Sequence, residues 1–77
     1  MDITVTLIND DPFGNNVVVA DNNAGQAEIF RGYMEPQAEQ MVQCAQNGAG
    51  FGNISTTTDG NSAVGHSFLH EGDTVRI

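Results

Sequence analysis

Turn signals recur along the whole chain, about every 10 to 13 residues, and each gap between them holds a short apolar or alternating segment. The turns are runs of Asp, Asn, Gly and Pro. These residues favour tight reversals because Pro fixes φ and Gly permits positive φ. Short strands at this spacing, with a turn signal between each pair, are typical of a small β-sandwich or barrel.

The segment 2–8 gives the clearest strand signal. It alternates strictly, with Ile3, Val5 and Leu7 on one face and threonines on the other, which predicts a half-buried strand. Flanking turns and apolar content predict further strands over residues 15–20, 26–32, 51–58, 62–69 and 74–77.

The strand expected over 62–69 carries Val64, His66 and Phe68 at alternate positions, so these three side chains are expected on one face. Phe68, and Phe30 in the strand over 26–32, are expected to lie in the core.

Residues 36–46 fit two structures. Four apolar residues between Ala38 and Ala45 recur at helical spacing, and Pro36 suits a first helical turn. The same residues also alternate as a strand over 39–45. We expect the strand, with a helix at about 36–46 as the alternative.

With that strand, the chain 1–77 forms one domain, an all-β, small antiparallel β-sandwich of about seven short strands. Its layout resembles an immunoglobulin-like sandwich reduced to minimum length, and a resemblance of fold implies no function. With the helix instead, the chain would be an α+β domain with that helix packed on a sheet.

Charge excludes two kinds of partner. Ten acidic residues stand against two basic ones, Arg31 and Arg76, and the formal net charge is −8. Nucleic-acid phosphates and anionic membranes should repel such a chain, so we expect neither as a partner. No apolar run approaches the roughly 18 residues of a membrane span.

Cys44 is the only cysteine, so the chain has no internal disulfide to support its small core. Self-association or a metal would supply that support instead. A single cysteine and the lack of a signal peptide favour a cytoplasmic location, with a removed leader as the alternative.

Acidic and amide side chains in two turns could hold calcium, which prefers oxygen ligands. Residues 21–25 match the opening of a calcium loop, but Gln26 and Gly32 stand where an EF-hand requires Gly and Glu. Asp and Asn also occupy turns because they bond their own backbone. We therefore expect no cofactor, with calcium as the alternative at Asp10, Asp11, Asp21 and Asn23.

Catalysis is not expected. Cys44 has no neighbouring cation to lower its pKa and is interpreted as a small buried residue. His66 and His70 are interpreted as one strand and one loop histidine, because zinc needs three or four converging ligands.

Three residues are candidates for an exposed apolar contact. Phe13 stands at a turn tip, and Tyr33 and Met34 lie in a connection. Aromatic residues and Met are enriched at interface cores, although a core position would explain them equally.

These observations favour a non-catalytic, acidic binding or assembly module that acts through protein–protein contacts. Its strands carry Thr, Gln and Asn and no Lys, which leaves their edges able to pair. We expect a homo-oligomer, a dimer, besides an unknown protein partner. The alternatives are an acidic decoy that inhibits a basic nucleic-acid-binding protein, and calcium- or sugar-binding loops on a β-sandwich.

Overall fold

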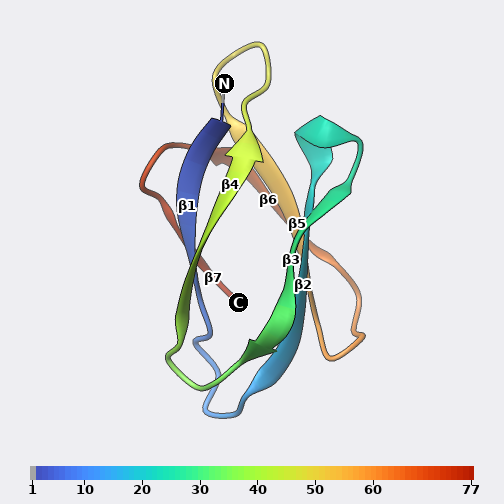
Figure 1. Ribbon diagram of the computed structural model, residues 1–77, viewed down its shortest axis with the longest axis vertical. Coiled ribbons are helices and arrows are strands. Elements are labelled where there is room, and N and C mark those ends of the chain that lie inside the picture. The colour runs from blue at the N-terminus through green and yellow to red at the C-terminus, as the bar shows by residue number, and fades with distance from the viewer. Residues whose placement is uncertain (1) are drawn as a thin grey trace.

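The computed structural model describes residues 2–77 and consists of two β-sheets packed face to face, as Figure 1 shows. Its elements in chain order are β1 (Asp2–Ile8), β2 (Asn15–Asp21), the 3-10 turn η1 (Asn22–Ala24), β3 (Ala27–Met34), β4 (Glu39–Ala45), β5 (Gly52–Thr58), β6 (Val64–Leu69) and β7 (Thr74–Arg76). One sheet has the strand order β4-β1-β7 and the other β3-β2-β5-β6. The predicted β-sandwich is confirmed.

Strand β4 decides between the two structures predicted for residues 36–46. It pairs antiparallel with β1, which brings Val42 opposite Val5 and Cys44 opposite Ile3. Val42 and Cys44 are buried, whereas Gln43 between them is exposed, as is Met41 before them. Pairing with β1 therefore fixes a two-residue period and overrides the helical spacing of the apolar residues.

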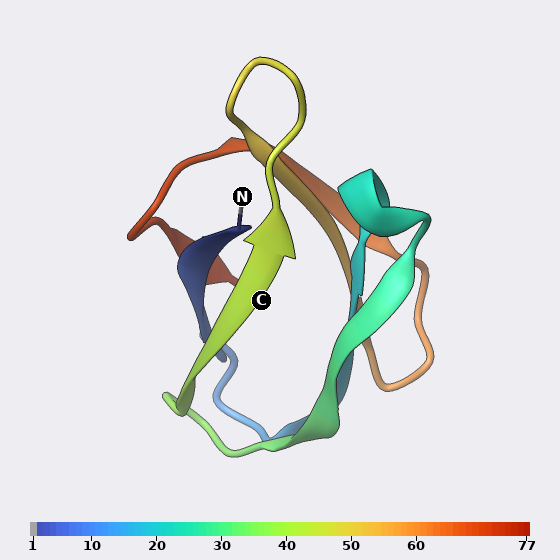
Figure 2. The ribbon, with the colours of Figure 1, turned by 45° about the horizontal axis from the view of Figure 1, so that its top comes forward.

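The order of the strands differs from that of an immunoglobulin domain, whose first sheet combines the first, second, fourth and fifth strands. Here β1 pairs with β4 on one side and, in parallel, with β7 on the other. The sandwich is therefore antiparallel except at β1–β7. Figure 2 shows the connections that carry the chain from one sheet to the other.

The core lies between the sheets and takes residues from every strand, at alternate positions in β1, β2 and β4. Its buried apolar residues are Ile3, Val5, Leu7, Val17, Val19, Met34, Val42, Cys44, Ile54, Leu69 and Val75. Ile29, Phe30, Ala38 and Ile77 pack against this cluster and are partly buried.

A buried amide holds the β1–β2 turn in place. Asn9 is fully buried, and its Nδ2 donates hydrogen bonds to the carbonyl oxygens of Phe13 (3.0 Å) and Met34 (2.9 Å). Its Oδ1 accepts from Asp11 N (3.1 Å) and Asn15 Nδ2 (3.2 Å). The turn is thus bonded to the end of β3.

A buried carboxylate joins the two sheets at the other end of β2. Asp21 is 3% exposed; its Oδ2 accepts from Ala45 N (2.7 Å), and its Oδ1 accepts from Asn23 N (3.1 Å). Asn23 Nδ2 donates to the carbonyl oxygens of Ala45 (2.9 Å) and Phe51 (3.0 Å). These bonds link the β2–η1 corner to the end of β4.

The expected alternation of β6 is interrupted near its end. His66 pairs with Ile54 and Leu69 with Gly52, so two residues of β6 oppose one residue of β5. Phe68 has φ +58° and is 71% exposed, while Leu69 enters the core in its place. The prediction that Phe68 lies in the core is therefore wrong.

Candidate functional site

A hollow of about 250 Å³ opens beside the free edges of the two sheets, at β6 and β7. Its lining residues are Thr56, Thr58, Val64, His66, Arg76 and Ile77. This volume is below the roughly 300–1,000 Å³ of pockets for drug-sized ligands. The hollow is therefore suited to a side chain or a small group.

A threonine and a histidine meet in the hollow. His66 Nε2 lies 3.0 Å from the Oγ1 atom of Thr56, which is 3% exposed. Burial lowers the pKa of His66, so the neutral imidazole is favoured. A hydroxyl beside a neutral imidazole is part of a nucleophile–base arrangement. Within residues 2–77, however, no carboxylate is hydrogen-bonded to His66 to orient it.

The rim of the hollow carries one ion pair. Arg76 Nη1 lies 3.3 Å from Asp10 Oδ1, and both side chains are more than half exposed. An exposed pair of this kind contributes about 0–1 kcal/mol, because water screens the attraction. Arg76 therefore remains free to exchange this partner for another carboxylate.

The two sheets have four edge strands in the described part of the chain, and three of these have a feature that hinders pairing along part or all of their length. Strand β3 carries the ion pair between Arg31 Nη2 and Glu28 Oε1 (2.7 Å) and is bulged beside it. The amide and carbonyl of Ala45 at the end of β4 are bonded to Asp21 and Asn23. Strand β7 is three residues long. Charges, bulges, covering groups and short length all hinder pairing with another chain.

Strand β6 is the exception among these edges. It contains no charged residue and no proline, and its outer edge has no neighbouring strand. It also exposes two large apolar side chains, Val64 (56%) and Phe68 (71%). The chain thus combines an open hydrogen-bonding edge and apolar surface on one strand.

The four calcium candidates lie in two separate turns. Asp21 and Asn23 form the structural bonds at the β2–η1 corner, while Asp10 pairs with Arg76 and Asp11 Oδ2 accepts from Asn15 Nδ2 (2.8 Å). Residues 2–77 contain no group of three or more His, Cys, Asp or Glu side chains placed to hold a metal ion.

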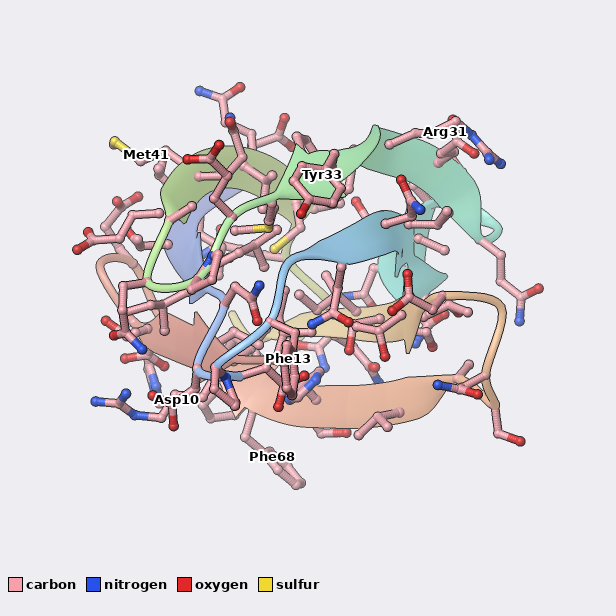
Figure 3. The ribbon with its side chains drawn as sticks, turned by 90° about the horizontal axis from the view of Figure 1, so that it is seen from below. Asp10, Phe13, Arg31, Tyr33, Met41 and Phe68 are labelled. Carbon is pink, nitrogen blue, oxygen red and sulfur yellow. The ribbon has the colours of Figure 1, made fainter. Side chains whose placement is uncertain are left out.

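The three interface candidates separate into two exposed residues and one core residue. Phe13 is 75% exposed and Tyr33 63% exposed, and Figure 3 shows their rings apart, on different segments. Met34 is 3% exposed because it faces inward opposite Asn15, so it cannot form an exposed contact.

The cysteine and histidine interpretations agree with the structure. Cys44 is buried and unpaired, and its pKa is raised by burial first and then by the carboxylates of Asp21, Asp2 and Glu71. His66 lies in β6, and His70 in the turn that follows it.

Sequence reasoning missed the exposed residues Val64, Phe68 and Met41, as well as the contact between Thr56 and His66. The absence of charged residues over 62–69 could have indicated an edge strand that is able to pair with another chain. The contact between Thr56 and His66 depends on register, which the sequence alone leaves open.

The chain matches no family model, no curated protein and no solved structure. None of the helical segments in residues 2–77 is long and apolar enough to cross a bilayer.

Proposed function

We propose that the chain is a non-catalytic binding or assembly module that acts through protein–protein contacts, and that one partner is a second copy of itself. The observation that carries this proposal is strand β6, an uncharged free edge with Val64 and Phe68 exposed. Such an edge is a template for pairing with another chain.

Charge favours the same surface for self-association. Two copies with a formal net charge of −8 each repel one another wherever their carboxylates approach. Strand β6 has no carboxylate, so pairing along it does not place carboxylates of the two copies opposite one another. Salt screens the remaining repulsion within about 10 Å at 0.1 M, so self-association should increase with ionic strength.

The small size of the chain limits the expected affinity of self-association. A standard interface covers about 800 Å² on each partner, nearly a fifth of the 4447 Å² surface of this chain. One six-residue strand covers only part of that area. We therefore expect a dimer that forms as the protein concentration rises and dissociates on dilution.

The test is molar mass in solution, measured by size-exclusion chromatography with light scattering over a range of protein concentrations at low and high salt. Wild-type protein should approach twice the chain mass at high concentration, and more readily at high salt. Val64→Lys places a charge on the edge strand and should keep the protein monomeric.

The matched control is Met41→Lys, because Met41 is an equally exposed apolar residue (66%) on β4. This variant should associate like the wild type. A wild-type protein that stays monomeric at every concentration, or equal effects of the two substitutions, would show that β6 is not the interface.

A further inference from the structure

Three ring side chains form a cluster where β5 begins and β6 ends. The ring of Phe51 makes edge-on contacts with Phe68 (centroids 5.5 Å apart, planes at 79°) and with His70 (5.0 Å, 86°). Figure 3 shows Phe68 projecting away from the body of the molecule. We call these three residues the aromatic cluster.

The backbone holds the cluster open to solvent. Phe51 is fixed on both sides, since its amide donates to Asn47 Oδ1 (3.0 Å) and its carbonyl accepts from Asn23 Nδ2 (3.0 Å). Phe68 has φ +58°, a left-handed conformation that is a rare outlier for a bulky residue. Strain of this kind is concentrated at binding sites, where the exposed group has a use.

Carboxylates surround the same end of the molecule. Asp73 Oδ2 accepts from His70 N (2.8 Å), and Glu71 Oε1 accepts from Thr4 N (3.0 Å).

The two arginines are engaged elsewhere, and at this end His70 Nδ1 lies 3.6 Å from Asp73 Oδ2. Arg31 pairs with Glu28 on β3, and Arg76 pairs with Asp10 beside the β1–β2 turn. The aromatic cluster therefore combines exposed ring surface and local negative charge, and neither arginine of the chain is bonded to its carboxylates.

We infer that the aromatic cluster, with Glu71 and Asp73 beside it, binds an arginine side chain from a basic segment of another protein. A guanidinium stacks on an aromatic face through a cation–π interaction and can donate hydrogen bonds to a carboxylate at the same time. Arginine fits better than lysine because its planar, weakly hydrated group stacks on rings. This partner is distinct from the second copy proposed above, and its binding does not require self-association.

The test uses an oligo-arginine peptide with blocked ends, and an oligo-citrulline peptide of equal length as its uncharged analogue. Binding is followed by calorimetry and by NMR shifts of the phenylalanine ring protons. Oligo-arginine should bind and shift the Phe51 and Phe68 rings, and oligo-citrulline should not. Absence of oligo-arginine binding would overturn the inference.

Two variants separate the cluster from general attraction between opposite charges. Phe68→Leu keeps an apolar side chain but removes the ring, and should weaken oligo-arginine binding roughly three- to tenfold. Phe13→Leu is the control, since Phe13 is similarly exposed (75%) and follows Asp10 and Asp11 in the chain, separated from them only by Pro12. It should bind like the wild type.

Equal affinities of the two variants would mean that diffuse charge attraction alone holds the peptide, which would refute the site. Molar mass is recorded on the same samples. A monomeric protein that still binds oligo-arginine would overturn only the proposed self-association, and a dimer that does not bind it would overturn only the aromatic cluster.

Discussion

Gly52 is the position where a single added methyl group should be most informative about how the sheets pack. It is a buried glycine at the start of β5. A Cβ at this position would lie 2.8 Å from Ile3 Cδ1, 2.9 Å from Cys44 Sγ and 3.3 Å from Leu69 Cβ. Non-bonded carbons prefer about 3.5–4.0 Å, so the methyl group would overlap both sheets.

Two opposed effects determine how much Gly52→Ala changes the free energy of unfolding. Restricting the unfolded chain stabilises a compatible Gly→Ala site by about 0.4–1 kcal/mol. Overpacking a core costs about 1–3 kcal/mol. The free energy of unfolding should therefore fall by about 1–2 kcal/mol, which lowers the melting temperature of a domain this size by roughly 4–16 °C.

Urea denaturation followed by far-UV circular dichroism measures this change, since the chain has no tryptophan to serve as a fluorescent probe. Gly65→Ala is the matched control, because Gly65 lies in β6 and a Cβ there has no atom within 4 Å. It should leave stability unchanged or raise it slightly.

A second substitution tests whether the clash with Ile3 causes the loss of stability in Gly52→Ala. Ile3→Val removes the Cδ1 atom that the new methyl group would strike, at a cost of about 0.5–1.5 kcal/mol in the wild type. In the Gly52→Ala background the cost should be smaller by about 0.5–1 kcal/mol, because the clash is relieved. An Ile3→Val cost that is identical in both backgrounds would refute the close approach of the sheets at Gly52.

Two further predictions concern polar groups inside the fold. Asp21→Asn should lower the free energy of unfolding by about 2–3 kcal/mol in urea denaturation, because an amide NH₂ then replaces one of the two acceptor oxygens that face backbone amides. Asp59→Asn is the control, since Asp59 is exposed and accepts one hydrogen bond, from Asn16 N, and this variant should change the free energy of unfolding little. The lowered pKa of His66 means that the unfolded chain takes up a proton before the folded one does, so stability should decrease as the pH falls from about 6.5 through the folded-state pKa. A His66→Gln variant should lack that component, and a wild-type curve with the same slope as this variant would contradict the prediction.

The strands were predictable where local pattern and tertiary pairing agree. In β1 the alternation of Ile3, Val5 and Leu7 places all three in the core, as periodicity requires. Over 39–45 the local pattern allowed two structures. Only the long-range pairing with β1 selects the strand, and long-range pairing is the information that a sequence window lacks.

Phe68 shows where pattern reasoning fails for a physical reason. Predicted alternation assumes an unbroken pleat, whereas a bulge reverses the side on which the following residues point. A glycine at position 68 would have indicated a left-handed conformation, but a phenylalanine does not. The exposed ring could therefore not be predicted from the sequence.

The acidic turns have a use that composition does not reveal. Asp21, Asn23 and Asn9 have the chemistry of cation ligands, yet each is bonded to backbone groups within the fold. A small domain without disulfides has few ways to fix its corners, and buried charge-assisted bonds are among the strongest available. These side chains therefore act as internal links between the sheets.

These internal links leave few parts of the surface available to bind another chain. The β3 edge carries an ion pair and a bulge, the last residue of the β4 edge is bonded to these internal links, and the β7 edge is short. Strand β6 and the aromatic cluster at its end remain, and both expose apolar surface. Exposed apolar surface beside an open hydrogen-bonding edge is stabilised most by contact with another chain. A Val64 substitution therefore tests the edge strand. A Phe68 substitution tests the aromatic cluster, and because Phe68 also belongs to the exposed surface of β6, molar mass is measured on the same variant.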